Sequence, residues 1–287
     1  MKSRKGNWKM KSVYIIPKRE QIEESLRLSK EYNTNFEYND FFLPEVLDDE
    51  GKKKELIAFY KSLPRKRCQD TMHGAFLDVT LHSSDKRIRE VSELRVRQSM
   101  EIAKELGIRG VIFHTNLIAN FKDSSYLKNW VNANAAFYRK VLSEYPGIYV
   151  FVENMFDLEP DMLLELAQEM KEEAYFGVCL DYAHASISKV PAGKWLEMLK
   201  PYIKHMHIND NDLKEDLHQA IGQGCIDYQE YTRFMKEKQL EVSVLVEMNT
   251  VEEQDSSLAY MRKNQIYPLV PEMEMGKGKE KETGNCV

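Results

Sequence analysis

Short apolar runs alternate with longer amphipathic segments along most of the chain. The runs are rich in β-branched and aromatic residues and end at polar residues, which is typical of buried strands. The longer segments repeat apolar residues every three or four positions, which is typical of helices packed on a sheet. The predicted strands are 12–17, 35–40, 68–76, 110–116, 148–154, 175–183, 203–209 and 241–249, and the predicted helices are 19–33, 51–63, 85–106, 126–145, 160–173, 191–201, 227–239 and 253–265.

This alternation predicts an α/β protein built as a single (β/α)₈ TIM barrel, because eight strand–helix units and 287 residues match one such domain. A doubly wound open sheet would also alternate. It normally carries a Gly-rich phosphate turn after its first strand, and the sequence has none there. We expect the barrel domain to span residues 1–266. Residues 267–287 lose periodicity and become charged, so we expect a disordered C-terminal tail.

Composition and charge exclude several classes of protein. The net charge of −5 provides no field that would draw nucleic acid or an anionic membrane to the protein. The N-terminus is basic but lacks the apolar region of a secretory signal, and the sequence has no apolar run long enough to span a membrane. We therefore expect a cytoplasmic protein without membrane contact. The four cysteines form no C-x-x-C pair, so a thiolate zinc site is not predicted.

Histidine and carboxylate residues end six of the predicted strands. In a barrel of this kind the active site lies at the carboxyl ends of the strands, so these side chains are expected to meet. Neutral imidazole and carboxylate are ligands of divalent cations such as zinc and manganese. The sequence therefore predicts a metal site from His73, His114, Glu153, Asp181, His184, His207, Asp216, His218 and Glu247.

Each of these residues also has a structural interpretation. A single histidine at a strand end is more often hydrogen-bonded to backbone than bound to metal, whereas a carboxylate after an apolar strand requires a cation or another partner. Six strands ending this way favour the metal site. We expect His205 to lie deeper than His207 on the same side of its strand, either as a structural residue or as one that supports a ligand. We expect His82 to be solvated and Lys204 to lie at the surface at the start of its strand. The candidates for an aromatic substrate wall are Phe76, Phe156, Tyr182 and Trp195.

Seven stretches between about residues 68 and 249 resemble the motif series of a known superfamily. They are HGAFLD, IFHTN, VFVENMF, VCLDYAHA, HMHINDND, DLHQAIGQGCID and VLVEM. The series resembles that of the xylose-isomerase-like TIM-barrel superfamily, which contains apurinic endonuclease IV and the sugar (phosphate) isomerase/epimerases. The chain departs from the endonuclease at SVYIIPKRE, which lacks a Gly-His-type opening. It also has Phe76 where that family usually has tyrosine.

The resemblance implies two schemes for the same residues. Similarity to endonuclease IV implies that all nine ligands hold three metals, with Glu153 bridging two of them. Similarity to the ketose epimerases implies one cation held by Glu153, Asp181, His207 and Glu247. In that second scheme Glu153 and Glu247 are also the catalytic acid/base pair. His184, His218 and Phe76 then contact the substrate.

The predicted βα loops favour the second scheme. EYNDFFLPEVLDDEGKKK, ENMFDLEPD and NTVEEQD are acidic, and an acidic rim disfavours a DNA duplex. Our primary hypothesis is a metal-dependent sugar or sugar-phosphate isomerase/epimerase with one zinc or manganese ion and a small-molecule sugar substrate. The alternative is an endonuclease IV-like phosphodiesterase, with up to three ions, acting on abasic DNA or another phosphodiester. A non-catalytic binding barrel is the third class. The sequence predicts neither the sugar nor the oligomeric state.

Overall fold

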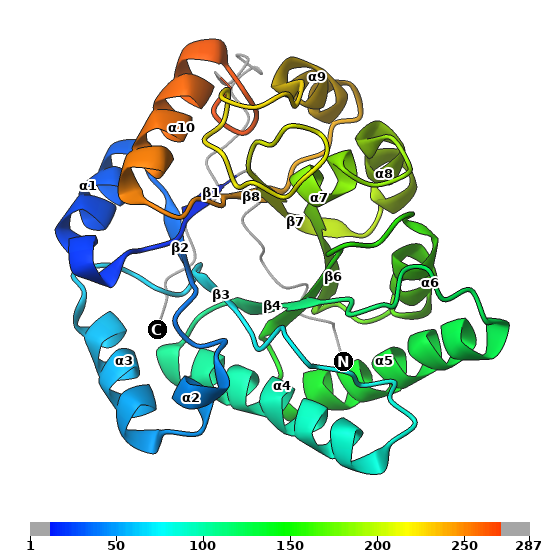
Figure 1. Ribbon diagram of the computed structural model, residues 1–287. Helices are drawn as coiled ribbons and strands as arrows, with labels where there is room; N and C mark the ends of the chain where they lie inside the picture. The colour runs from blue at the N-terminus through cyan, green and yellow to red at the C-terminus, as the bar shows by residue number, and fades with distance from the viewer. Residues whose placement is uncertain (1–11, 271–287) are drawn as a thin grey trace.

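The structure, a computed structural model, describes residues 12–270. Within them, eight parallel strands form a closed barrel in sequence order, and the last strand pairs with the first (Figure 1). This confirms the predicted (β/α)₈ TIM barrel and excludes the open sheet. The strands are β1 (Val13–Ile15), β2 (Asn35–Tyr38), β3 (Thr71–His73), β4 (Gly110–His114), β5 (Tyr149–Glu153), β6 (Phe176–Asp181), β7 (Ile203–Ile208) and β8 (Ser243–Val246).

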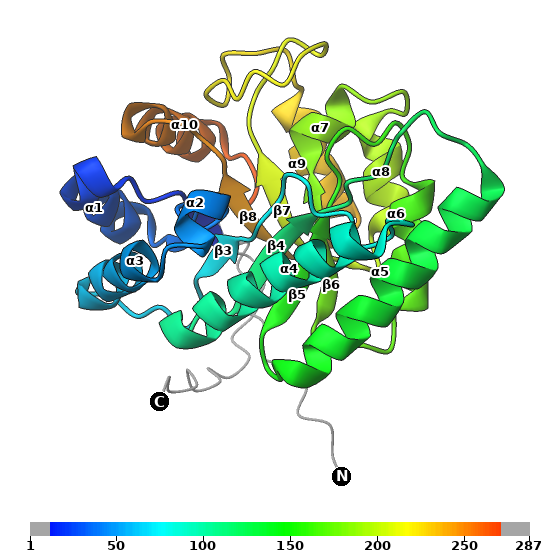
Figure 2. The same cartoon turned by 60° about the horizontal axis from the view of Figure 1, so that its bottom comes forward.

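Helices connect the strands and form an outer ring around the barrel, as the tilted view shows (Figure 2). Asp85 caps the predicted third helix through the backbone amides of Arg87 and Ile88, and Gly107 ends that helix in the left-handed region at φ 68°. The helical elements are η1 (Arg19–Gln21), α1 (Ile22–Tyr32), α2 (Pro44–Leu47), α3 (Glu50–Ser62), α4 (Lys86–Leu106), α5 (Ser124–Glu144), α6 (Asp161–Glu169), α7 (Tyr182–Ser186), α8 (Ala192–Leu199), α9 (Tyr228–Glu237) and α10 (Val251–Asn264). The short α2 and α7 were not predicted.

The lumen of the barrel is filled in layers. Side chains alternate between the two faces of a strand, so a residue two positions before a mouth residue lies one layer deeper. A fully buried layer therefore lies beneath the mouth: Ile112, Phe151, Cys179, His205 and Leu245. His205 stacks on Phe151 with ring centroids 5.7 Å apart, which places it where the sequence predicted a structural histidine. This buried layer fills the lumen below the mouth, so the polar residues of the next layer lie at the open end of the barrel.

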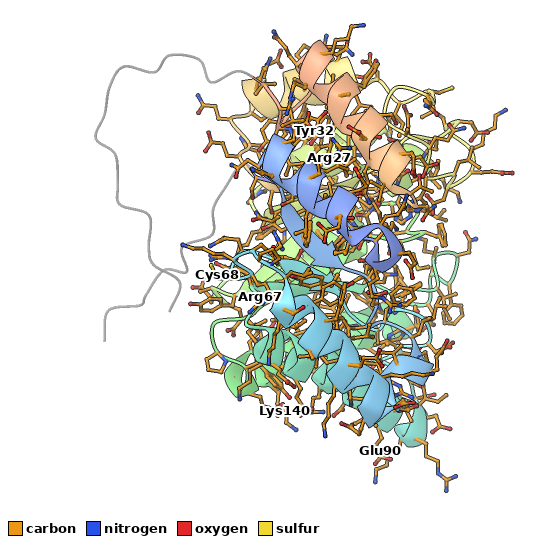
Figure 3. The ribbon with its side chains drawn as sticks, turned by 90° about the vertical axis from the view of Figure 1, so that its left-hand side faces the viewer. Arg27, Tyr32, Arg67, Cys68, Glu90 and Lys140 are labelled. Atoms are coloured by element: carbon orange, nitrogen blue, oxygen red, sulfur yellow. The ribbon has the colours of Figure 1, made fainter. Side chains whose placement is uncertain are left out.

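The first and last helices close the ring of helices. Arg27 of α1 forms ion pairs with Glu24 and Glu31 of its own helix and with Asp255 of α10. Arg262 of α10 lies over the ring of Tyr32, 3.8 Å from its centroid. Figure 3 shows this side of the molecule, with Arg27 and Tyr32 on α1 beside α10. These contacts join the two ends of the barrel sequence.

Residues 267–270, which the sequence assigned to the tail, contact the barrel. Tyr267 is buried, its hydroxyl donates to the carbonyl of Val242, and it also accepts from the amide of that residue. The rest of the predicted tail, residues 271–287, lies outside the described residues. Between residues 12 and 270, no helix combines the length and apolarity needed to cross a membrane.

Candidate metal centre

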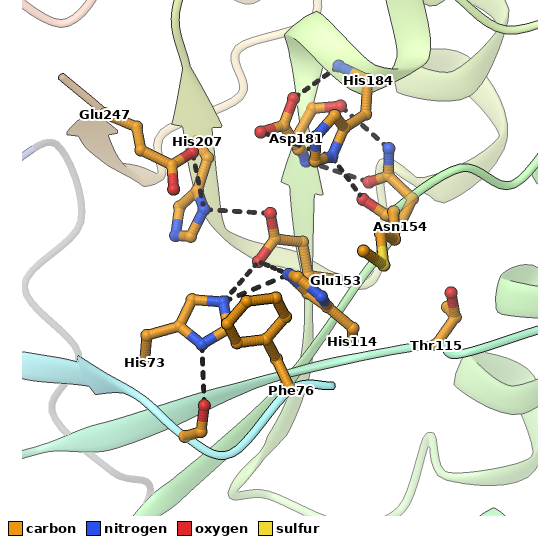
Figure 4. A network of polar contacts seen from close by, with 12 residues as sticks. His73, Phe76, His114, Thr115, Glu153, Asn154, Asp181, His184, His207 and Glu247 are labelled. Carbon is orange, nitrogen blue, oxygen red and sulfur yellow. Dashed lines mark hydrogen bonds and ion pairs between the residues drawn. The ribbon is translucent and has the colours of Figure 1, made fainter. Parts of the chain in front are cut away.

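Four side chains from neighbouring strands converge at the mouth of the barrel. Glu153 ends β5, Asp181 ends β6, His207 lies near the end of β7 and Glu247 directly follows β8. Their ligand atoms all lie within 4.8 Å of one another (Figure 4). Nδ1 of His207 lies 3.0 Å from Oε1 of Glu153 and 3.5 Å from Oε2 of Glu247. These four residues are called the central group below.

Glu153 also belongs to a second group, which it forms with His73 and His114. Oε2 of Glu153 lies 3.7 Å from Nε2 of His73 and 3.5 Å from Nε2 of His114. The two Nε2 atoms are 3.1 Å apart. Nδ1 of His73 is 2.9 Å from the carbonyl of Gly74, so this nitrogen is placed to donate and Nε2 is left to face the group.

A third group consists of His184, Asp216 and His218. Oδ2 of Asp216 lies 3.2 Å from Nε2 of His184 and 3.3 Å from Nε2 of His218. We predicted that an extended D-x-H would aim both side chains the same way. The stretch is not extended at His218, which has φ 48°, and this left-handed turn brings the imidazole back onto Asp216.

The third group depends on a loop organised by Asp210. The buried Asp210 carboxylate accepts from the backbone amides of Gly222, Ile226 and Asn211. The backbone of Asp210 also pairs with Gln219 in an antiparallel bridge. These bonds position the segment that carries Asp216 and His218.

Gly224→Ala is expected to destabilise the protein by about 1–3 kcal/mol and to weaken the third group. A Cβ at Gly224 would lie 2.4 Å from the carbonyl oxygen of Asn211 and 2.4 Å from Oδ1 of Asp210, so the loop must shift. Gly193→Ala is the matched control, because a Cβ there meets nothing within 4 Å. Denaturant unfolding measures both variants. A Gly224→Ala protein as stable as the Gly193→Ala control would contradict this account of the loop.

The residues present fit a divalent cation. Among the described residues, buried oxygens of Glu153, Asp181, Asp216 and Glu247 have no hydrogen-bond donor. Asp181 shows the reason: its Oδ1 accepts from the amide of His184 and caps α7, while Oδ2 faces the site. Buried carboxylate oxygens without a donor are costly unless a cation lies among them. The mixed nitrogen and oxygen donors suit zinc, manganese, cobalt or iron.

The protonation of the site shows how strongly the charges interact. Burial raises the pKa of Asp181 to about 6. Burial opposes ionisation of Glu153 as well, but His207 and His114 hold the pKa of that carboxyl well below its usual range. Burial would lower the pKa of His207, yet the neighbouring Cys179 and the carboxylates of Glu153 and Glu37 raise it well above the usual value. Burial would also lower the pKa of His218, but the hydrogen bond to Asp216 outweighs it and raises that pKa to about 9.

The sequence missed three residues at the site. Glu37 of β2 is fully buried beside His207, and Asn154 ties β5 to β6 through two 2.9 Å hydrogen bonds to the backbone of Asp181. Phe42 contacts Phe76 edge-to-face, with centroids 5.0 Å apart. The available signal for Glu37 was a carboxylate between two aromatic residues in NFEY.

Two of the four candidates for the aromatic wall lie beside the ligand groups, and their contact with a substrate stays a prediction. Phe76 lies 5.3 Å from His73 and 5.1 Å from His114, and Phe156 lies 5.5 Å from His184, measured between ring centroids. Tyr182 and Trp195 are wrong, because both side chains are buried in the main hydrophobic core outside the lumen.

One prediction about a surface residue is wrong. His82 is 5% exposed and contacts the hydroxyl of Tyr126 at 3.1 Å. Lys204 lies at the start of β7 and is partly exposed, and its ammonium donates to the carbonyls of Ala174 and Phe176.

The xylose isomerase-like TIM barrel model matches residues 39–264, a segment that contains all nine predicted ligands. The chain belongs to this family. The family match begins two residues after Glu37, which therefore lies outside it.

The chain is also similar to curated proteins and to solved structures. The uncharacterized protein MJ1311 of Methanocaldococcus jannaschii is 27% identical over 184 residues, covering 60% of this chain and 62% of the relative. The chain spans less than two thirds of the curated relatives that it matches. A D-tagatose 3-epimerase-like protein has a TM-score of 0.70 at 20% identity, with 88% of this chain and 96% of that chain covered. The TTHB071 protein from Thermus thermophilus, soaked with ZnCl2, has a TM-score of 0.67 at 22% identity, with 88% and 97% covered. These two likenesses show the fold.

Proposed function

We propose that this protein is a divalent-metal-dependent isomerase or epimerase of sugars or sugar phosphates. The observation that carries the proposal is the pair Glu153 and Glu247, two carboxylates on either side of His207 Nδ1 at the mouth of the barrel. Membership of the xylose isomerase-like family supports it. The structural likeness to a protein described as D-tagatose 3-epimerase-like also supports it.

A pocket beside Glu247 is suited to a small polyol. Its volume is about 280 Å³, and it lies between the ends of β1, β2 and β8. Carboxylate and amide groups can each bind vicinal hydroxyls, and an aromatic ring can cover the apolar face of a sugar. The lining residues that supply these groups are Lys18, Asn39, Asp40, Phe42, His218, Glu247 and Asn249.

The central group would hold the metal ion. Such an ion polarises the carbonyl and hydroxyl oxygens of a bound α-hydroxy carbonyl compound. Glu247, on the pocket wall, would remove the carbon-bound proton, and the proton would be returned by the same carboxyl or by Glu153 after Glu153 has taken up a proton from solvent. His207 and neighbouring groups keep the pKa values of both carboxyls low despite burial, which suits the ionised carboxylate that removes the proton. His218 and His184 would donate to substrate oxygens, and Phe76 would cover the site from the β3 side.

A phosphodiesterase like endonuclease IV is the second candidate. The specific observation in its favour is that the second and third groups each bring three ligand atoms within 4.8 Å of one another, although one cation needs only the central group. A cluster of two or three ions suits phosphodiester hydrolysis by a bridging hydroxide. Elemental analysis of the purified protein separates the two candidates. One exchangeable ion per chain supports the isomerase, and two or three tightly bound zinc-class ions support the phosphodiesterase.

The direct test of the primary function is exchange of a substrate proton with solvent. A panel of ketoses and ketose phosphates is incubated in deuterated water with the protein and Mn²⁺, Co²⁺ or Zn²⁺. We expect one sugar to incorporate deuterium at the carbon next to its carbonyl, and EDTA to stop the incorporation. Nicking of an abasic duplex without any exchange across the panel would contradict the isomerase and support the second candidate.

A further inference from the structure

We propose that Glu37 is a positioning residue that fixes the tautomer of His207 and so presents Nδ1 of that ring to the metal ion. The inference rests on the part of the proposed function in which the central group binds a divalent cation. It does not depend on which reaction follows. No residue of β2 was among the predicted ligands, and Glu37 contacts the central group through His207.

Glu37 lies between two histidines inside the barrel. Oε1 of Glu37 is 3.0 Å from Nε2 of His207, and Oε2 is 3.1 Å from Nε2 of His205. Oε2 also accepts a 2.7 Å hydrogen bond from the hydroxyl of Thr71 on β3. The side chains of all three partners are buried, so protein donors must satisfy the carboxylate. The Glu37 carboxylate lies where it can accept from an N–H group of each imidazole.

His205 is the second imidazole that faces Glu37. Its Nδ1 lies 2.6 Å from the hydroxyl oxygen of Ser243, and that hydroxyl donates its single proton to the carbonyl of Lys204 at 3.2 Å. Oε2 of Glu37 faces Nε2 of His205, which leaves Oε1 for His207, whose Nε2 lies 3.0 Å away. A proton on Nε2 of His207 is therefore the state that Glu37 stabilises.

His207 differs in this respect from the other histidines of the site. In His73, His184 and His218 it is Nδ1 that contacts a backbone carbonyl, at 2.9, 3.0 and 3.4 Å, and Nε2 that faces a ligand group. In His207 the order is reversed: Nε2 faces a carboxylate, and Nδ1 faces the central group. A carboxylate behind a ligating histidine orients the ring and increases its basicity, and loss of such a partner typically costs 10–100-fold in metal affinity.

The consequence for metal binding follows from the groups around Nδ1. With the proton on Nε2, the Nδ1 lone pair lies among the oxygens of Glu153 and Glu247, at 3.0 and 3.5 Å. A lone pair between two carboxylates is repelled unless a cation lies among them. Glu37 thereby holds the proton that His207 keeps on Nε2, so Nδ1 is the nitrogen that gives up its proton and binds the metal ion.

The chain offers a matched control in Asp70, another fully buried carboxylate. Asp70 accepts from the amide of Phe36 and the hydroxyl of Tyr38 and forms an ion pair with Arg65, without touching any residue of the three ligand groups. Glu37→Gln and Asp70→Asn each remove one buried negative charge and keep the side-chain shape. Both are expected to destabilise the fold, and only the first is expected to affect the metal site.

The test uses the full chain and Co²⁺ as the probe. Dissociation constants come from competition with a chelator, and the protonated nitrogen of His207 comes from long-range ¹H–¹⁵N NMR of the zinc-loaded protein. We expect Glu37→Gln to bind Co²⁺ about 10–100-fold more weakly and to change its absorption spectrum. We expect Asp70→Asn to keep the wild-type affinity and spectrum. Wild-type His207 should show a proton on Nε2.

Two results would overturn the proposal. One is a folded Glu37→Gln protein with wild-type Co²⁺ affinity and spectrum. The other is wild-type His207 that carries its proton on Nδ1, a measurement that decides the matter even where the variant does not fold. Neither readout involves a sugar. Weakened Co²⁺ binding in Glu37→Gln together with an inactive ketose panel would therefore retain the role of Glu37 and reject the isomerase.

Discussion

Glu153→Gln is expected to reduce substrate proton exchange by about 10²–10⁴-fold at saturating metal, the range typical of losing a positioned acid or base. The amide cannot accept the proton that the proposed reaction returns to carbon. Glu153 is also the only residue shared by the second group and the central group, so its loss removes negative charge from both. We therefore expect the variant to bind less metal as well as to react more slowly. Deuterium incorporation into the reactive sugar measures the rate, and elemental analysis measures the metal.

Glu169→Gln is the matched control for this prediction. Glu169 lies at the end of α6, is half exposed and pairs with Arg139 on the outer surface. An exposed pair of this kind contributes little to stability, so the control should keep wild-type exchange and wild-type metal content. Full exchange in Glu153→Gln at equal metal content would show that this carboxylate has no part in proton transfer.

Metal affinity is expected to rise steeply between pH 6 and pH 9, by up to about tenfold per pH unit for each proton displaced. The raised pKa values of His207 and His218 mean that these rings carry protons in the metal-free protein at neutral pH. A metal ion that binds Nδ1 of His207 must displace the proton there. Asp181, whose pKa is raised to about 6, adds a further competing proton at the acidic end of this window.

The same protons set how stability depends on pH. A histidine whose folded-state pKa is raised stabilises the metal-free protein below its unfolded pKa, and this contribution is lost as pH rises toward about 9, the value for His218. The stabilisation gained on adding metal should therefore be small at pH 6 and large at pH 9. Thermal unfolding with and without EDTA across this range measures the difference. A metal-induced shift in Tm that stays constant from pH 6 to pH 9 would contradict the assignment of these histidines as protonated ligands.

The sequence was sufficient for the barrel because eight strand–helix units alternate along it, and for much of the site because six of the strands end in histidine or carboxylate. His114, Glu153 and Asp181 fall on strand ends that the apolar runs locate within one or two positions. In a parallel barrel all such ends meet at the same rim, so one-dimensional spacing becomes three-dimensional proximity. The two glycines of the G-x-G in the loop after β7 lie where the backbone needs a residue without a side chain. Gly222 adopts φ 89°, and Gly224 lies against the backbone of Asn211.

The remaining features of the site could not be predicted, because they depend on which face of a strand or helix a side chain occupies. Glu37 belongs to a four-residue strand, too short for the alternation to show which face is the lumen. Tyr182 directly follows the ligand Asp181, but the turn into α7 directs its ring to the helix layer. The left-handed backbone at His218 likewise has no signal in the letters D-L-H. For Tyr182 and His218 a local turn, rather than the pattern, determined the direction of the side chain.

The account depends on one claim, that residues from four neighbouring strands bind a common divalent cation. Anomalous diffraction from crystals soaked in Mn²⁺ tests this most directly. We predict a peak within coordination distance, about 2.0–2.3 Å, of Glu153, Asp181, His207 and Glu247 together. The absence of any peak among these four residues at saturating Mn²⁺ would contradict the claim, as would a peak bound to surface carboxylates alone.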